Sequence, residues 1–169
     1  MSTSHEWNDE TLAVHVGRPP HVPGAPVNYP IGLSTTFVAG DSRGYIREGT
    51  LGTEALEHAL GALERGHSIV FSAGIATVSA VVDLLPANAV VVAPNHAYPG
   101  ALNRLRELQT GGRIQLREVL ISDTDEVVAA CKGAHLVWVE SPTNPLMEVA
   151  DIRAIVKAAH QSGALVAVD

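Results

Sequence analysis

From Thr53 onward, short apolar runs alternate with stretches in which apolar residues recur at helical spacing. The runs predict strands at 68–71, 89–93, 115–120, 136–140 and 164–168. Helices are expected between them at 75–85, 98–109, 124–131 and 151–162. The runs are apolar on both sides, which is typical of strands that helices cover on both faces. The alternation therefore predicts an α/β domain with a mostly parallel sheet.

Residues 1–52 show little periodic pattern and are rich in proline and glycine. The segment 17–26 cannot form a regular helix or a central strand. Only 8–16 can form a short helix, with Asn8 or Asp9 as its cap. Because long irregular segments usually wrap a neighbour or shape a site, we expect an arm over 1–52. The domain at 53–169 then opens with a helix over 53–65.

Composition narrows the class of protein. Apolar residues make up 46% of the 169 residues, which is ample for a packed core. The net charge of -7 disfavours binding to nucleic acid. The sequence contains neither an apolar run of membrane-spanning length nor an apolar stretch at the N-terminus, so no membrane contact is expected. The single Cys131 excludes an internal disulfide, and the scattered histidines suggest no metal site, so we expect a cytoplasmic protein.

Chemistry-bearing residues follow several of the predicted strands. Ligands of open α/β sheets bind beyond the carboxyl ends of the strands. The residues found there are the turn 72–75, Tyr98, the turn 140–145 and Asp169. A small residue, an aromatic ring, an amide and a carboxylate are therefore expected at one edge of the sheet.

Each of these residues has two interpretations. Gly74 lets a phosphate approach the start of a helix, or it serves only a tight turn. Tyr98 stacks on a flat aromatic ligand and transfers a proton, or it packs at a domain edge. Asp169 holds a protonated ring nitrogen, or it caps a following helix.

Two further residues are ambiguous when each is taken alone. Arg47, in the arm, offers a planar fork that suits phosphate, but it also fits a solvated surface position. Asn144 stands between prolines, where it reaches a ligand oxygen or simply makes a turn. Neither residue decides a function without the others.

The order and spacing of several short motifs are more specific than any one of them. They are Tyr45-Ile46-Arg47, Ser72-Ala73-Gly74-Ile75-Ala76, Tyr98-Pro99-Gly100 and Glu140-Ser141-Pro142-Thr143-Asn144-Pro145. Together they resemble the Cys/Met-metabolism (transsulfuration) family of pyridoxal-phosphate (PLP) enzymes, whose members include cystathionine γ-synthase and cystathionine γ-lyase. The resemblance covers nearly the whole chain. It implies the large domain of the PLP-dependent transferase fold, fold type I, incomplete at its C-terminus.

The resemblance also implies roles for residues in the second half of the chain. Ser72, Gly74 and Ile75 form the loop that binds the phosphate of pyridoxal 5'-phosphate. Tyr98 stacks on the pyridine ring and, as the catalytic residue, helps to move protons. Asn144 lies near the ring hydroxyl, and Asp169 pairs with the ring nitrogen.

In the arm, the resemblance implies that Tyr45 and Arg47 bind the phosphate of the adjacent subunit's cofactor. The arm then contacts a neighbouring subunit, and the protein is a homo-oligomer, a dimer of dimers. The resemblance further implies a substrate that is a small sulfur amino acid, such as cystathionine, a homocysteine precursor or methionine. The reaction it implies eliminates or replaces a group at the γ or β carbon, with γ chemistry favoured.

The chain departs from the family pattern at its end and at Gly100, where methionine γ-lyases commonly carry cysteine. The family's Schiff-base lysine lies beyond Asp169, and the chain's only lysines, Lys132 and Lys157, fall in helical stretches. We therefore expect the rest of the large domain and a C-terminal domain elsewhere, and no activity from this chain alone. The alternative is a truncated or split non-catalytic α/β module that binds a phosphate compound or assembles with a second chain.

Overall fold

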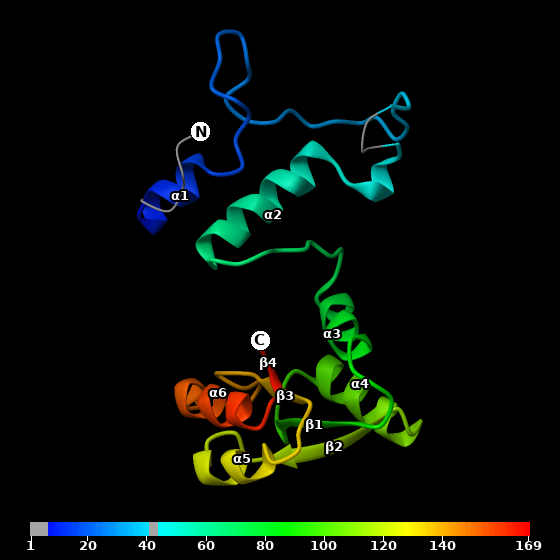
Figure 1. The fold of residues 1–169 in the computed structure, drawn as a ribbon, viewed down its shortest axis with the longest axis vertical. Coiled ribbons are helices and arrows are strands. Elements are labelled where there is room, and N and C mark those ends of the chain that lie inside the picture. Colours follow the sequence, from blue (N-terminus) through cyan, green and yellow to red (C-terminus); the bar gives the residue numbers. More distant parts are fainter. Residues whose placement is uncertain (1–6, 41–43) are drawn as a thin grey trace. The chain divides into compact units, whose positions relative to one another are not determined.

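The computed structural model describes residues 7–40 and 44–169, which divide into two compact units, the first ending at Phe71 and the second spanning 72–169 (Figure 1). Each unit is described by itself. The boundary after Phe71 places the helix expected at 53–65 with the N-terminal residues, whereas the sequence pattern grouped it with the sheet.

The second unit is built on a parallel sheet of four strands. They are β1 (Ala89–Pro94), β2 (Ile114–Val119), β3 (Leu136–Val139) and β4 (Leu165–Val168), in the order β2-β1-β3-β4. Ala89 pairs with Ile114 and Pro94 with Val119, so β1 and β2 run level over their whole length. The predicted parallel sheet is confirmed, with strand ends within one residue of those expected from the apolar runs.

Helices cover both faces of this sheet. They are α3 (Gly74–Asp83), α4 (Pro99–Thr110), α5 (Thr124–Ala130) and α6 (Ile152–Gln161). Val91 of β1 packs in one cluster with residues of α3 and α4, whereas Val90 and Val92 pack in another with residues of α5 and α6. Val91 is fully buried, which contributes about 1.5–3 kcal/mol for a valine side chain. Helices on both sides of the sheet make three layers, which explains why the predicted strands are apolar on both faces.

The first unit holds α1 (Asp9–His15), the short 3-10 helix η2 (Ile46–Glu48) and α2 (Leu51–Leu63). Asn8 caps α1 as expected, because its side chain accepts a hydrogen bond from the Thr11 backbone N–H at 2.9 Å. Helix α2 begins two residues before its predicted start because Thr50 caps it, accepting from the Thr53 N–H at 3.1 Å. The rest of the arm is largely irregular, as its composition indicated.

The strand predicted at 68–71 is wrong. No ladder partner for these residues exists in the part of the chain that the structure describes, and Ile69 is 75% exposed. The Val70 N–H donates instead to Glu57 Oε1 of α2 at 2.9 Å. A strand needs a neighbouring strand to pair its backbone, so an apolar β-branched run is not sufficient by itself.

Candidate cofactor site

A hollow of about 660 Å³ lies at the carboxyl ends of the strands in the second unit. We call it the carboxyl-end pocket, and it is lined by Ala73, Gly74, Ile75, Thr77, Val78, Tyr98, Glu140, Ser141, Pro142, Asn144 and Asp169. The structure thus brings together five of the predicted site residues, Gly74, Ile75, Tyr98, Asn144 and Asp169. Ser72 is exposed and immediately precedes this lining, and its contact with a cofactor stays a prediction.

Helix α3 starts at the wall of this pocket. Its N-cap is Ala73, and no side chain from the described residues caps the first turn. The N–H groups of a first turn have no partner within the helix, and the helix dipole adds about half a positive charge there. An added Cβ on Gly74 would meet nothing within 4 Å, so the backbone at this point is open to a ligand. These features favour an anion such as a phosphate.

Tyr98 stands at the start of α4, where Pro99 occupies the first helical position. Its side chain is 47% exposed at the mouth of the pocket. The ring lies against Gly100, since a Cβ added there would be 2.5 Å from Tyr98 Cε1. The pocket lining therefore includes an aromatic residue that is held beside the first turn of α4.

Asp169 follows β4 and is held by its backbone. Its N–H donates to Val139 O at 2.8 Å, and its carbonyl accepts from the Ser141 N–H at 3.5 Å. Within the described part of the chain, its carboxylate has no hydrogen-bond or salt-bridge partner. A carboxylate that lines a pocket without a partner is suited to a protonated nitrogen of a ligand.

Glu140 is a lining residue to which the sequence analysis gave no role of its own. It directly follows β3, is only 6% exposed, and lines the pocket. Its Oε2 accepts from the Tyr98 N–H at 2.7 Å, and its Oε1 accepts from the Asn144 N–H at 2.8 Å. The available signal was a charged residue directly after a buried apolar strand, because burial of a carboxylate demands partners.

The turn after β3 is fixed by side chains as well as by its backbone. Thr143 is fully buried and accepts from the Glu148 N–H at 3.0 Å, while Ser141 Oγ accepts from the Ala150 N–H at 3.0 Å. The Met147 N–H also donates to Thr143 O at 2.8 Å. This network sets the position of Asn144 at the pocket.

The carboxyl-end pocket is acidic. Its described lining includes the carboxylates of Glu140 and Asp169 and no lysine, arginine or histidine. Neither Lys132 nor Lys157 belongs to the lining. Among the lining residues, a phosphate at the start of α3 therefore meets no cationic side chain and is favoured by the helix dipole.

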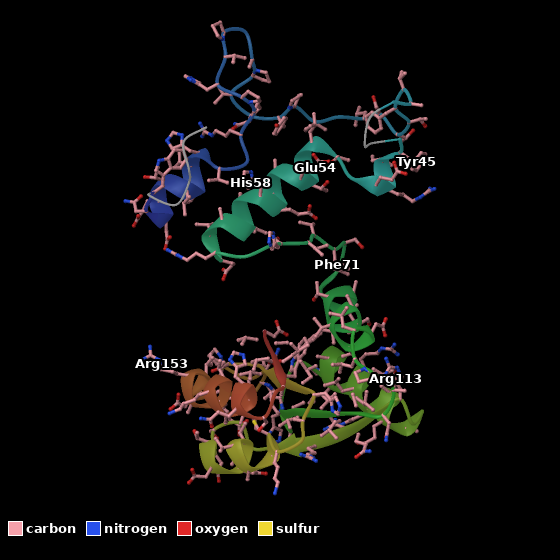
Figure 2. All side chains as sticks on the ribbon, viewed as in Figure 1. Tyr45, Glu54, His58, Phe71, Arg113 and Arg153 are labelled. Carbon is pink, nitrogen blue, oxygen red and sulfur yellow. The ribbon has the colours of Figure 1, made fainter. Side chains whose placement is uncertain are left out.

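Tyr45 lies in the first unit, beside the start of α2 (Figure 2), and Arg47 belongs to the short helix η2 that follows it. The Arg47 guanidinium carbon is 4.2 Å from the centroid of the Tyr45 ring, in a cation–π arrangement. Glu48 accepts from the Gly44 and Tyr45 N–H groups at 2.7 and 2.9 Å, and these backbone hydrogen bonds lower the pKa of Glu48. The pair is thus preorganised on a capped turn.

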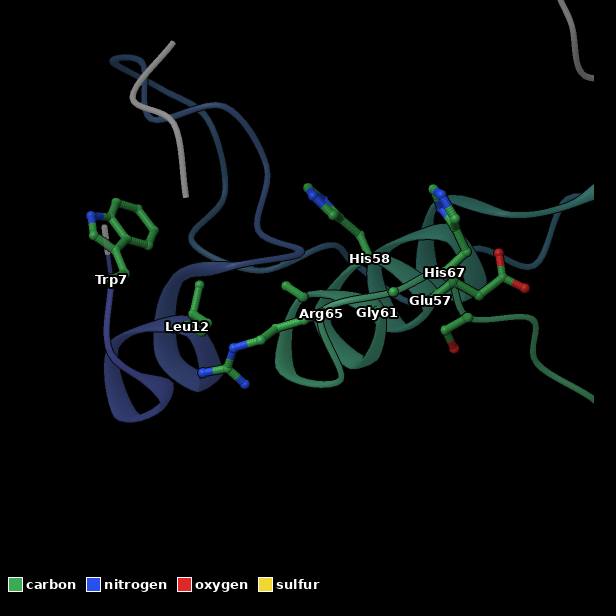
Figure 3. Close-up of a pocket in the computed structure, with 10 residues that line it drawn as sticks. Trp7, Leu12, Glu57, His58, Gly61, Arg65 and His67 are labelled. Atoms are coloured by element: carbon green, nitrogen blue, oxygen red, sulfur yellow. The ribbon is translucent and has the colours of Figure 1, made fainter. Parts of the chain in front are cut away.

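A second hollow, of about 720 Å³, lies in the first unit against α1 and α2 (Figure 3). Trp7 and Leu12 line it from the α1 side, and Glu57, His58, Arg65 and His67 line it from α2 and the segment that follows. The Arg65 guanidinium also binds Asp9 at 2.9 Å. None of the predicted cofactor residues lines this hollow.

None of the described helices is long and apolar enough to cross a membrane. The described residues contain no group of three or more histidine, cysteine, aspartate or glutamate side chains arranged to hold a metal ion.

Over residues 10–169 the chain matches the family described as Cys/Met metabolism PLP-dependent enzyme. The chain belongs to this family. The match confirms the resemblance seen in the motifs and identifies pyridoxal 5'-phosphate as the family's cofactor. The pocket fits such a group, because it combines an open helix start, an aromatic ring, an amide and an unpaired carboxylate.

Relatives and solved structures agree with this family. Cystathionine γ-synthase of Mycobacterium tuberculosis is 38% identical over an alignment of 169 positions, which covers 94% of this chain and 43% of that protein. Cystathionine γ-lyase of Mus musculus is 33% identical over 166 residues, with 94% and 42% covered. Cystathionine γ-synthase from Xanthomonas oryzae pv. oryzae, solved in complex with cystathionine, has a TM-score of 0.85 at 29% identity and covers 96% of this chain and 44% of its own. The chain spans less than half the length of these proteins.

Proposed function

We propose that residues 72–169 are the cofactor-binding part of an enzyme that eliminates or replaces a group at the γ or β carbon of a sulfur amino acid. The observation that carries the proposal is the meeting of the α3 start, Tyr98 and Asp169 in one pocket of a Cys/Met-metabolism family member. Bound pyridoxal 5'-phosphate supplies an electron sink for the substrate carbons. This chain's residues bind and orient it.

The ends of the cofactor are assigned by the chemistry of the lining. The backbone N–H groups of Gly74 and Ile75, at the uncapped start of α3, bind the phosphate. The Asp169 carboxylate accepts a hydrogen bond from the protonated ring nitrogen and so stabilises its charged form. Opposite charges are thereby matched at the two ends of the pocket.

The sides of the ring are assigned to Tyr98 and Asn144. Tyr98 stacks on the ring, and its phenolic oxygen takes and returns protons near the substrate amine. The Asn144 side-chain amide donates to the ring hydroxyl, and the turn after β3 holds it there. These side chains orient the ring.

In this proposal, a second copy of the chain supplies the positive charge that the phosphate site lacks. The pocket lining supplies no cation, whereas Arg47 carries one on an ordered turn beside Tyr45. The arm also exposes Ile31, Leu33 and Val38 at 93%, 89% and 92%. Apolar side chains so exposed are typical of a surface that a partner covers. We therefore infer a homo-oligomer, a dimer of dimers, in which the arm reaches a neighbouring subunit.

The substrate class follows from the relatives. The compared proteins are named cystathionine γ-synthase and cystathionine γ-lyase, and one of them was solved with cystathionine. Gly100 occupies the position where methionine γ-lyases commonly carry cysteine. We therefore infer γ chemistry on a cystathionine-type substrate. A cytoplasmic location is part of the proposal, supported by the free, buried Cys131.

Covalent attachment of the cofactor requires a lysine that the described pocket does not provide. We infer that residues 1–169 bind the cofactor without a covalent bond and turn over no substrate by themselves. Turnover then depends on a lysine from the rest of a longer protein, or from a second chain that carries the C-terminal half.

Two measurements test the proposal. Addition of pyridoxal 5'-phosphate to the full-length protein should give a visible absorbance band with induced circular dichroism, and cystathionine should then release a keto acid and a thiol product. The alternative, a non-catalytic α/β module, predicts cofactor or phosphate binding without any product. If the full-length protein did not bind the cofactor at all, the proposal would be refuted.

A further inference from the structure

We infer that Glu140 is a positioning residue, which fixes the ring-stacking Tyr98 and the Asn144 amide at a set separation on either side of the carboxyl-end pocket. The two positions lie 42 residues and 4 residues from Glu140 along the chain, in the loop before α4 and in the turn after β3. One carboxylate therefore joins two walls of the pocket. The inference extends the proposed function. Its expected effects on cofactor binding rest on that function, whereas the link between the two loops does not.

The geometry shows that both oxygens of the carboxylate are engaged. Oε2 accepts from the Tyr98 N–H at 2.7 Å and Oε1 from the Asn144 N–H at 2.8 Å, at the short end of the range for N–H···O bonds. A charged acceptor strengthens both bonds, and 6% exposure shields them from competing water. The paired N–H groups also offset the cost of burying the charge.

The role is positioning and not proton transfer. Both carboxylate oxygens already accept from backbone groups, so neither is left to exchange protons with a ligand. Glu140 acts on the ligand through the residues whose backbone it holds. Tyr98 is the N-cap residue of α4, and its side chain makes no capping hydrogen bond. The Glu140 carboxylate binds the Tyr98 N–H and so orients the residue at the start of that helix.

The turn after β3 has other anchors, so loss of Glu140 should leave the fold in place. Ser141 Oγ binds the Ala150 N–H, and the Asp169 N–H binds Val139 O. Thr143 is held by Glu148 through their backbones at 3.0 Å. The link between the turn and Tyr98, in contrast, runs through the Glu140 side chain.

The test compares three variants of the full-length protein. Glu140→Gln keeps the volume but replaces one acceptor by an NH2 group, which faces a backbone donor. Glu140→Asp keeps the charge but is one methylene too short to reach both N–H groups. Glu126→Gln is the matched control, because Glu126 Oε2 also accepts a backbone N–H, that of Leu120 at 3.2 Å, away from the pocket.

Amide hydrogen exchange, followed by mass spectrometry on peptides that contain Tyr98 and Asn144, provides a readout independent of activity. We expect both Glu140 variants to raise exchange at the two sites and to weaken pyridoxal 5'-phosphate binding about tenfold to hundredfold, as for loss of a hydrogen bond to a charged group. The control should change neither. Excess cofactor should restore part of the activity.

Unchanged exchange at either site in Glu140→Gln would overturn the inference, as would faster exchange without weaker cofactor binding. If one variant fails to fold, the other decides by the same two readouts. Absence of cofactor binding by the wild-type protein would refute the proposed function. The exchange data would still show whether Glu140 holds the two loops.

Discussion

The ring of Tyr98 lies on the backbone of Gly100, at a spot where no side chain fits. A Cβ on residue 100 would stand 2.5 Å from Cε1 and 2.8 Å from Cζ of that ring. Glycine at this position therefore lets the tyrosine fold back over the first turn of α4. Any larger residue must displace the ring.

Gly100→Ala should accordingly shift the ring with little loss of stability. Alanine in a helix gains up to about 1 kcal/mol over glycine, which offsets part of the cost of moving the half-exposed tyrosine. Cofactor stacking should weaken severalfold, about 1 kcal/mol. Titration with pyridoxal 5'-phosphate measures this. Gly52→Ala is the control, because Gly52 is also the second residue of a helix and its added Cβ meets only Thr50 Oγ1 at 3.7 Å.

Asp169→Asn should remove the charge that holds a protonated ring nitrogen. We expect the full-length enzyme to lose about a hundredfold or more in kcat, because a neutral amide does not hold the ring nitrogen in its charged form. Cofactor binding should also weaken. Asp125→Asn, on the exposed side of α5, should leave both measurements unchanged. Equal activity of the two variants would contradict the role given to Asp169.

The ion pair between Arg106 of α4 and Glu118 of β2 predicts an acid-dependent stability. Two hydrogen bonds, Nε–Oε1 at 2.9 Å and Nη2–Oε2 at 2.6 Å, lower the pKa of Glu118 below its ordinary 4.5. Because the folded pKa is depressed, the stabilisation is complete above about pH 4.5 and is lost as the pH falls through the folded value. Its size is at most about 1 kcal/mol for such a partly exposed pair.

Urea unfolding of wild type and Glu118→Gln between pH 3 and 7 measures this contribution. The two proteins should differ in midpoint near neutral pH and converge in acid. Glu107→Gln serves as the control, because its contact with Arg104 at 3.8 Å is exposed. A constant difference at every pH would contradict the assignment.

The thiol of Cys131 should be unreactive in the folded protein. Burial raises the pKa of its thiol, and the thiolate is the form that reacts. An aromatic disulfide reagent at neutral pH should therefore label it only as the protein unfolds in urea. Rapid labelling of the folded protein would contradict the burial of this residue among Val127 and Ile155.

The sequence predicted most of the second unit because local signals and tertiary packing agree there. The run 89–93 is apolar on both faces, and both faces are buried. The run 68–71 is also mostly apolar and β-branched, but it has no strand partner among the described residues, and its Val70 N–H donates to Glu57. Strand pairing is non-local, so this error could not be seen in the run itself.

Part of the candidate site could likewise be predicted from the sequence, and part of it could not. Gly74, Tyr98 and Asp169 were predicted to meet because parallel strands end at one edge, and they line one pocket. The role of Glu140 depends on a contact with Tyr98, 42 residues away, which no spacing rule contains. The positions of Tyr45 and Arg47 relative to a cofactor remain predictions, because they depend on a subunit contact.

The acidic lining of the carboxyl-end pocket has a thermodynamic consequence. If the balancing cation belongs to another copy of the protein, cofactor affinity and self-association are linked, and each must strengthen the other by the same free energy. Dilution should then release pyridoxal 5'-phosphate, and added cofactor should drive monomers together. The cofactor would then stabilise the oligomer as well as take part in the reaction.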